Sequence, residues 1–296
     1  PDVVIISNAM LMGIVRRVRE SIKAPILVTL QGETPFLDSL AEVDASAAWL
    51  ALRERSQEVD GLIAVSKTYG DEMRQRLEVA PQKLHVVHNG IDVDEFRLPK
   101  TNSPLPKTIG FLARMCEDKG LDTLVDAFLT LKQRNAIPGL RLRVAGVQLT
   151  EDKAYVNELR RRIRNAGFIN DTDFLPNIDR RAKVAFLHSL TALSVPARYQ
   201  ESFGLYLLEA MASGVPVVQP RHAAFPEIIE ATGGGILCEP DDNESLANAL
   251  ESVLSDDQLH QKLSTLGNAS VTANFTKEHM AQNVAEICRS LILDNV

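Results

Sequence analysis

Cysteine, aromatic residues and long apolar runs are all scarce in this chain of 296 residues. The three cysteines, Cys116, Cys238 and Cys288, lie far apart, so they supply neither a disulfide framework nor the closely spaced ligands of a zinc site. No apolar run approaches the roughly 20 residues that a membrane-spanning helix needs. The sequence therefore gives no support to a disulfide-rich, zinc-binding or membrane-spanning class of protein.

Positive charge is also in deficit. The chain has 32 Lys and Arg against 39 Asp and Glu, which gives a net charge of −7. Proteins that bind nucleic acid generally carry a basic surface, so this balance argues against a nucleic-acid partner. The hydrophobic content of 45% is ordinary for a globular protein, and the length is sufficient for two domains. With so few cysteines, we expect a cytoplasmic protein.

Short apolar runs alternate with helical patterns along the whole chain, which is typical of βαβ units and predicts an α/β fold with parallel sheets. Strands are expected at residues 3–7, 26–30, 61–65, 84–88, 108–112, 140–145, 172–175, 190–195, 215–218 and 235–237. Helices are expected at residues 9–21, 45–58, 67–77, 120–134, 153–165, 180–187, 205–212, 224–229, 244–254 and 277–293.

A polar, proline-bearing stretch interrupts this alternation. It covers Leu98–Lys107 and follows the turn Asn89-Gly-Ile-Asp92. Such a stretch predicts a linker between two domains. We therefore expect a first domain at residues 1–98, a second at 99–274 and a final segment at 275–296.

The most informative segment runs from Glu201 to Glu209, in the sequence Glu-Ser-Phe-Gly-Leu-Tyr-Leu-Leu-Glu, and continues as Ala-Met-Ala-Ser-Gly-Val-Pro-Val-Val to Val218. A small-residue turn opens a short apolar helix here. The first N–H groups of a helix and the positive end of its dipole attract an anion, and Gly204 lets a ligand approach the backbone closely. The two carboxylates can accept hydrogen bonds from sugar hydroxyls. These residues indicate a ligand with a phosphate in the middle and hydroxyls on both sides.

A second motif, Gly110-Phe-Leu-Ala-Arg-Met-Cys-Glu-Asp-Lys-Gly120, ends the first strand of the second domain. Ligands of open α/β sheets bind at the carboxyl ends of the strands. Arg114 offers a planar fork that can grip a phosphate with two hydrogen bonds, and Lys119 adds a mobile point charge. A basic pair by itself is more often a solvated surface. The pair could also neutralise the diphosphate that leaves when a sugar is transferred.

Together the two motifs resemble those of the retaining glycosyltransferases of family four. Those proteins have the pattern Glu, seven residues, Glu, with Phe-Gly after the first Glu, and Arg, four residues, Lys-Gly upstream. The resemblance implies the GT-B fold, in which two Rossmann-like domains have parallel sheets that face a cleft and the last helix returns to the first domain. It also implies an incomplete first domain, because Pro1-Asp-Val-Val-Ile resembles the middle of that domain.

The resemblance assigns sugar contacts to the first half of the Glu201 segment. Glu201 would act as a catalytic residue that holds hydroxyls of the transferred sugar. Gln31 stands where the family usually has a histidine that can touch this sugar, and glutamine can make hydrogen bonds but cannot carry charge. The backbone that would meet the sugar and phosphate belongs to Ser202, Phe203, Gly204 and Leu205.

Nucleotide contacts are implied for the second domain. Glu209 would accept hydrogen bonds from the ribose hydroxyls, and Arg114 and Lys119 would stabilise the diphosphate as catalytic residues. The nucleobase would lie near Asn177 and Ile178. UDP-sugar is the expected donor, with GDP-sugar and ADP-sugar as alternatives.

The implied reaction is the metal-independent transfer of a hexosyl group, with retention, by attack on the face from which the diphosphate departs. The acceptor would be a lipid-linked sugar, a polysaccharide precursor or a small metabolite, and no cofactor takes part. Two alternatives stay open. The chain could bind a donor without turnover, as a pseudoenzyme or regulatory fragment, or it could be a GT-B disaccharide phosphorylase or synthase.

Two further patterns receive a structural interpretation. Asp92-Val-Asp94 and Asp171-Thr-Asp173 both spell the metal-binding motif of the other large glycosyltransferase fold, but one forms a turn and the other leads into a strand. No metal ligand is therefore predicted. The first helix also carries a basic stretch, for which we expect a solvated face, with weak peripheral contact on the inner face of the membrane as the alternative. It comprises Arg16, Arg17, Arg19 and Lys23.

Overall fold

The computed structural model describes residues 1–97 and 106–293. The chain folds into two compact units, and each contains more than one segment. The first unit comprises Pro1–Gly90, Gln200–Phe203 and Phe275–Val296, and the second comprises Ile91–Tyr199 and Gly204–Asn274. The expected linker and the expected boundary at residues 98/99 fall almost entirely on residues outside the described ranges. Of the residues just before that boundary, 91–97 group with the second unit.

The first unit is built on a four-stranded parallel sheet in the order β1-β2-β3-β4. The strands are β1 (Val4–Ile6), β2 (Ile26–Leu30), β3 (Gly61–Ala64) and β4 (Leu84–Val86). The α-helices are α1 (Val15–Ser21), α2 (Thr34–Asp38), α3 (Glu42–Ser56), α4 (Lys67–Leu77) and α12 (Lys277–Leu293). Short 3-10 helices are η1 (Ala9–Ile14) and η2 (Pro81–Lys83).

Helix α12 covers one face of this sheet. Leu27 and Ile63, from the two central strands, form a buried cluster with Val87, and Met280 and Val284 of α12 pack against it. Strands β2 and β3 are therefore buried on both faces, which explains why they are almost continuously apolar in sequence. The last segment of the chain thus completes the core of the first unit.

The second unit has a six-stranded parallel sheet in the order β10-β9-β8-β5-β6-β7. Its strands are β5 (Thr108–Leu112), β6 (Arg141–Gly146), β7 (Thr172–Pro176), β8 (Ala192–Leu193), β9 (Val217–Pro220) and β10 (Gly235–Cys238). Its α-helices are α5 (Leu121–Arg134), α6 (Lys153–Asn165), α7 (Arg180–His188), α8 (Leu205–Ala212), α9 (Phe225–Thr232), α10 (Asn243–Ser255) and α11 (Asp257–Asn274). Its 3-10 helices are η3 (Val93–Phe96), η4 (Glu117–Lys119) and η5 (Ile169–Asp171).

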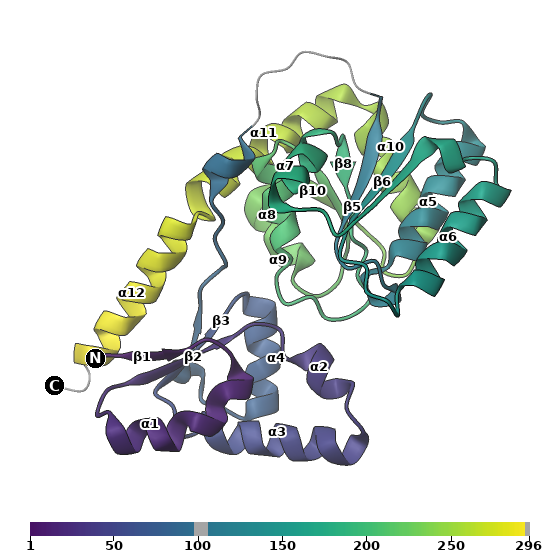
Figure 1. The fold of residues 1–296 in the computed structure, drawn as a ribbon. Coiled ribbons are helices and arrows are strands. Elements are labelled where there is room, and N and C mark those ends of the chain that lie inside the picture. The colour runs from purple at the N-terminus through teal and green to yellow at the C-terminus, as the bar shows by residue number, and fades with distance from the viewer. Residues whose placement is uncertain (98–105, 294–296) are drawn as a thin grey trace. The chain divides into compact units, whose positions relative to one another are not determined.

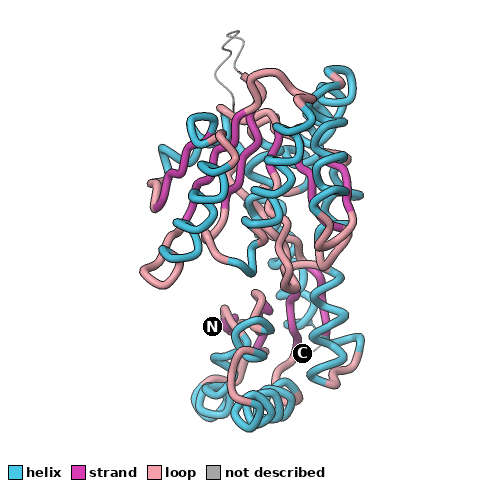
Figure 2. The backbone as a smooth tube through the Cα atoms, turned by 90° about the vertical axis from the view of Figure 1, so that its right-hand side faces the viewer, coloured by secondary structure: helices cyan, strands magenta, loops and turns pink. Residues whose placement is uncertain are grey.

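Helices cover both faces of the second sheet. Figure 1 shows α5, α6 and α10 on one face and α8 and α9 on the other, and α11 packs against α8 and α9. The trace in Figure 2 likewise shows strands lying side by side between helices. The largest described core cluster joins β5 and β6 to α5 and α10, with Phe111 and Phe128 among its fully buried side chains. This three-layer arrangement is the doubly wound α/β architecture.

The predicted fold class is confirmed, since both sheets are parallel and helices connect their strands. The predicted strands and helices are all present among the described residues, with bounds that differ by a few residues. Two helices were not predicted, the short α2 and the long α11. The buried residues of α11 are Leu263, Gly267 and Val271. Among residues 1–97 and 106–293, no helix combines the length and the apolar character that crossing a membrane requires.

Candidate functional site

The second unit has a topological switch point at β5. From β5 the chain runs outward through β6 and β7, and then it crosses to the other side of β5 to form β8, β9 and β10. The loops that follow β5 and β8 therefore diverge at the carboxyl end of the sheet, which is where open α/β sheets bind their ligands. The predicted residues Arg114 and Lys119 lie in the loop after β5, and Glu209 lies in α8, which follows β8.

Close backbone packing shapes these loops. Gly120, with φ of +69°, caps α5, and a Cβ atom on it would lie 1.9 Å from the carbonyl oxygen of Pro196 in the loop after β8. Gly146, with φ of +134°, would place a Cβ atom 1.9 Å from the carbonyl oxygen of Ala113. Only glycine is compatible with either position. The loop after β5 is thereby held against the loops of both its neighbours.

Arg114 is not an unoccupied phosphate clamp. Its Nε and Nη2 atoms donate to the two carboxylate oxygens of Asp152 at 3.0 and 2.9 Å, and Nη2 also donates to Glu151 at 3.0 Å. The fork that was expected to grip a phosphate is therefore filled by a carboxylate whose side chain is only 5% exposed. Hydrogen bonds from Arg114 hold the pKa of Asp152 below its ordinary value. No hydrogen bond of Nη1 of Arg114 is found among the described residues, and the two-point grip of Arg114 on a phosphate stays a prediction.

Lys119 is held by aromatic residues. Its ammonium donates a short hydrogen bond to the hydroxyl of Tyr199 and lies 4.5 Å from the centroid of that ring. It also lies 5.7 Å from the ring centroid of Tyr206, in the first turn of α8. Cation–π contacts orient a lysine while preserving its charge. The structure therefore brings Lys119 next to the start of α8.

Helix α8 begins at Gly204, whose φ of +87° is in the left-handed region and whose lack of a side chain leaves the helix start without a side-chain cap. The positive end of its dipole lies at this start, near Lys119. More than one turn later, the carboxylate of Glu209 accepts a 2.5 Å hydrogen bond from Lys183 of α7. The Glu209 side chain is 15% exposed, and only one of its oxygens is used by Lys183. Sequence reasoning missed Lys183, since nothing in the pattern of α7 marks it.

Asn177 and Ile178 follow β7 at the same end of the sheet. Asn177 has a φ of +55°, and its side chain accepts a 3.0 Å hydrogen bond from the backbone N–H of Gln148. This bond ties the turn after β7 to the loop after β6. Ile178 is half-buried. The contact of this turn with a nucleobase stays a prediction.

The segment leading to Glu201 is anchored by a half-buried ion pair. Arg198 grips Asp122 of α5 with two hydrogen bonds of 3.0 and 2.7 Å, and the hydroxyl of Tyr155 donates to the same carboxylate at 2.9 Å. Burial raises the pKa of Asp122, but Arg198 and Tyr155 outweigh it, and the net pKa is lowered. This anchor fixes the residue next to Tyr199, and it was also not predicted.

Leu205 is the first residue of α8 in the second unit, whereas Gln31, Glu201, Ser202 and Phe203 belong to the first unit. The hydroxyl of Ser66 donates to the carbonyl oxygen of Ser202 at 2.7 Å, and the ring of Phe203 is buried 6.0 Å from the ring of His88. Glu201 is half-buried, and the side chain of Gln31 is exposed. The structure thus divides the predicted site residues into two sets, one in each unit. Phe203 contributes a packed ring, while its backbone contact with a ligand stays a prediction.

Two sequence patterns set aside above are engaged in ion pairs. In the Asp-any-Asp pattern before β7, Asp171 pairs with Lys132 at 2.8 Å and Asp173 pairs with Arg141 at 3.3 Å. Among the described residues, no group of three or more His, Cys, Asp or Glu side chains is arranged to hold a metal ion. In the basic stretch of α1, Arg16 and Arg19 are paired with Glu58 and Asp60, respectively.

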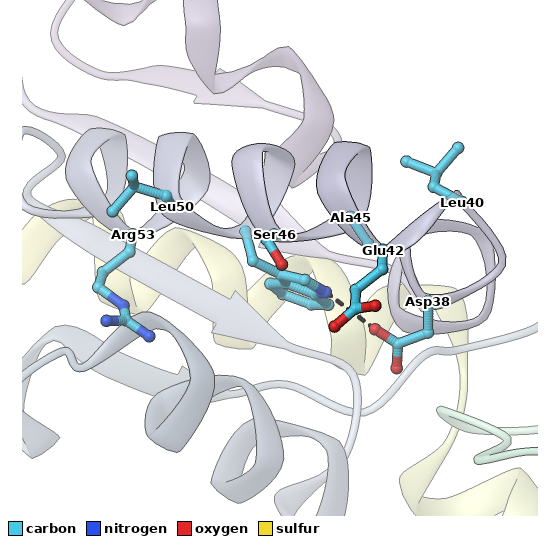
Figure 3. A pocket seen from close by; sticks show the side chains of 8 residues that line it. Asp38, Leu40, Glu42, Ala45, Ser46, Leu50 and Arg53 are labelled. Atoms are coloured by element: carbon cyan, nitrogen blue, oxygen red, sulfur yellow. Dashed lines mark hydrogen bonds between the residues drawn. The ribbon is translucent and has the colours of Figure 1, made fainter.

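A pocket of about 670 Å³ lies on the first unit between α2 and α3 (Figure 3). Asp38, Glu42 and Arg53 point to one side of α3, while Leu40 and Leu50 point to the other. The carboxylate of Asp38 accepts hydrogen bonds from the indole of Trp49 and from both terminal nitrogens of Arg76, each at 2.8 Å. The guanidinium of Arg76 also lies 4.7 Å from the centroid of the indole ring. Asp38 therefore joins α2, α3 and α4.

Comparison with known proteins gives this geometry a family. A sequence model described as "Glycosyl transferases group 1" matches residues 93–269, and another described as "Glycosyltransferase Family 4" matches residues 1–95. The glycogen synthase of Mycobacterium tuberculosis is 28% identical over 250 residues, which are 83% of this chain and 56% of that protein. The chain spans about half the length of the curated relatives that it matches.

Solved structures show the same fold. Sucrose-phosphate synthase from Thermosynechococcus elongatus superposes with a TM-score of 0.83 at 20% identity, over 99% of this chain and 74% of that one. HepE from Anabaena, in complex with UDP, gives a TM-score of 0.83 at 19% identity, over 97% and 79% of the two chains. These structures have the GT-B fold. The chain has the same fold, and it belongs to the glycosyl transferases group 1 family.

Proposed function

We propose that this protein transfers a hexosyl group from a nucleoside-diphosphate sugar, with UDP-sugar as the first candidate donor, to a hydroxyl group of an acceptor. Transfer occurs with retention and without a metal ion. One observation carries this proposal. Lys119, the start of α8 and Glu209 all belong to segments that follow β5 and β8 at the carboxyl end of the second sheet. The ammonium of Lys119 and the positive end of the α8 dipole can stabilise a diphosphate, and the carboxylate of Glu209 can accept hydrogen bonds from ribose hydroxyls.

The donor assignment is also supported by similarity. Structures of HepE contain UDP and UDP-glucose, and a glycogen synthase is among the curated relatives. In this proposal Glu209 is the acidic residue that accepts hydrogen bonds from the ribose, and the neutral turn at Asn177 faces the base. GDP-sugar and ADP-sugar are the alternative donors. The acceptor is a compound with a free hydroxyl group, and the turnover assay with different acceptors tests its class.

The proposed chemistry is a single substitution at the anomeric carbon. The bond between this carbon and the diphosphate oxygen breaks, and a bond to the acceptor oxygen forms on the same face. The proton of the acceptor hydroxyl passes to the departing phosphate oxygen, so no protein base is required. Lys119, the start of α8 and Nη1 of Arg114 stabilise the negative charge that develops on the diphosphate. Glu201 and Gln31 offer hydrogen-bonding groups for the sugar.

The test is a calorimetric titration of the chain with UDP, GDP and ADP, repeated on Glu209→Ala. Selective binding that is lost in the variant identifies the nucleotide and supports the assignment of Glu209. A second assay follows UDP release from UDP-glucose, with water or added saccharides as the acceptor and with EDTA present. Failure to bind any of the three nucleotides contradicts the proposal.

One observation favours binding without turnover as the second candidate. Arg114 directs most of its donors to Asp152 and Glu151 and keeps only Nη1 for a diphosphate. A site with less positive charge for the leaving group could still bind a nucleotide through Glu209. Nucleotide binding without measurable UDP release from UDP-glucose would select this candidate.

A further inference from the structure

Glu33 is a carboxylate buried inside the first unit. It is only 1% exposed, and its two oxygens accept hydrogen bonds from several donors at once. The backbone N–H of Gln31 donates to both oxygens at 3.0 Å, that of Gly32 to Oε2 at 3.0 Å, and that of Ala9 to Oε1 at 3.1 Å. The hydroxyl of Tyr69 completes the shell with a 2.7 Å bond to Oε2. Because Glu33 is almost fully buried, the hydrogen bonds of its carboxylate are made to protein donors.

These donors come from the segments that follow three adjacent strands. Ala9 follows β1, Gln31 and Gly32 follow β2, and Tyr69 lies in α4, which follows β3. The backbone N–H of Glu33 in turn donates to the hydroxyl of Tyr69 at 2.8 Å. Glu33 therefore ties together the carboxyl ends of β1, β2 and β3. In a parallel sheet, this is the end that carries ligand-binding groups.

The same framework holds the Glu201 segment. Ser66, which is fully buried, caps α4 by accepting a 3.1 Å hydrogen bond from the backbone N–H of Tyr69, and it donates to the carbonyl oxygen of Ser202 at 2.7 Å. Gly32 has a φ of +107°, and a Cβ atom on it would lie 2.8 Å from Oγ of Ser202. Ser202 therefore contacts both the turn that Glu33 fixes and the residue that caps α4.

We propose that Glu33 is a positioning residue that fixes the Gln31-Gly32 turn against Ser202 and thereby sets the position of Gln31 and Glu201. The proposal rests on the proposed function, since it assigns to these two residues the sugar of the donor. Glu33 itself is enclosed by protein donors and does not touch the ligand. Loss of Glu33 should therefore lower turnover without weakening the binding of the nucleotide, because the predicted contacts of the nucleotide lie in the second unit.

The test compares Glu33→Gln with the matched control Glu58→Gln. Glu58 is also a glutamate with several hydrogen bonds, but it precedes β3 and so lies at the opposite end of the same sheet. Amide hydrogen exchange, followed by mass spectrometry on the full chain, should accelerate about tenfold at Ala9, Gln31 and Gly32 in Glu33→Gln only, because an amide group cannot accept all the bonds of a carboxylate.

Turnover gives the second readout. The kcat for UDP release from UDP-glucose should fall about 10–100-fold in Glu33→Gln, the usual effect of misplacing groups by about 1 Å. The Kd for UDP should change by less than about twofold, as for independent sites. If Glu33→Gln fails to fold, Tyr69→Phe, which removes one donor to the same carboxylate, should show both effects in smaller degree.

Each outcome decides the proposal. Unchanged amide exchange in a folded Glu33→Gln variant overturns it, and so does accelerated exchange with unchanged kcat. An equal loss of kcat and of UDP affinity indicates general disruption and also overturns it. If the parent chain binds UDP but releases none from UDP-glucose, the proposed function has failed, whereas the exchange measurement still decides whether Glu33 holds the turn.

Discussion

The two units use different means at the carboxyl ends of their sheets. In the second unit the groups nearest the switch point are charged side chains held by other side chains, as in the pairs Arg114–Asp152 and Lys183–Glu209. In the first unit the carboxylate of Glu33 is buried. The exposed residue directly after β2 is Gln31, which is neutral. Under the proposed function, the second unit would stabilise the charge of the diphosphate, whereas the first would position the groups that meet the sugar. Substitutions in the two units should therefore change different quantities.

The largest effect is expected for Lys119→Ala in the second unit. Loss of this cation removes stabilisation of the departing diphosphate, so kcat for UDP release from UDP-glucose should fall by about 10²–10³. Lys107→Ala is the matched control, because Lys107 precedes β5 at the other end of the same strand and pairs with Asp257. If kcat decreases no more in Lys119→Ala than in Lys107→Ala, the proposed role of Lys119 in stabilising the diphosphate is wrong.

The next effect is expected for Glu209→Ala. Hydrogen bonds to a charged group contribute about 1.5–3 kcal/mol, so UDP binding should weaken about 10–100-fold. Calorimetry with UDP measures the change, and Glu158→Ala on α6, where Glu158 pairs with Arg161 at the surface, serves as the control. If Glu209→Ala binds UDP like the parent chain, Glu209 is a partner of Lys183 and has no role in ribose recognition.

A smaller effect, on stability, is expected for Arg114→Ala. In the folded chain Arg114 lowers the pKa of Asp152, so this pair stabilises the fold above the ordinary pKa of aspartate and ceases to do so as the pH falls through the lowered value. At pH 7 the variant should be less stable by about 1 kcal/mol, since Arg114 is partly exposed. Urea unfolding at pH 7 and pH 3 should show the gap closing at the lower pH. A gap that is constant with pH would mean that another group is responsible.

The smallest effect is expected in the first unit for Asp38→Asn. Asparagine can still accept from the indole of Trp49 but loses the charged pair with Arg76, which should cost about 0.5 kcal/mol for a partly exposed pair. Trp49 is the only tryptophan in the chain, so its fluorescence reports the change directly. Asp71→Asn, which breaks the surface pair with Lys67, is the control. A change in UDP affinity in Asp38→Asn would contradict the division of roles between the units.

Much of the fold could be predicted from the sequence, because buried parallel strands and amphipathic helices leave strong periodic patterns. β2, β5, α4 and α6 have the expected bounds, and Gly204 begins α8 as expected. Helix α11 escaped prediction because its second half is rich in residues of low helix propensity, among them Gly267, Ser270 and Thr272.

The residue types of the candidate site could also be predicted, but their partners could not. Arg114, Lys119 and Glu209 stand out through the spacing of their motifs, whereas Asp152 and Lys183 lie 38 and 26 positions away from the residues they pair with. Such pairings depend on which strands are neighbours and on loop conformation. Glu33 was overlooked for the same reason, since its donors come from three separate segments. A chemical motif is local, but the hydrogen bonds that orient it are not.

The packing of α12 on the first sheet bears on the order in which the protein forms during synthesis. Residues 1–90 are translated before α12, yet the sheet face around Leu27 and Ile63 is covered by this helix, which begins at Lys277. All segments of the second unit are translated in between. The core of the first unit therefore cannot close until residues 277–293 have been made. Until then this apolar face is exposed, as in other transient folding species, and is open to a nascent-chain chaperone.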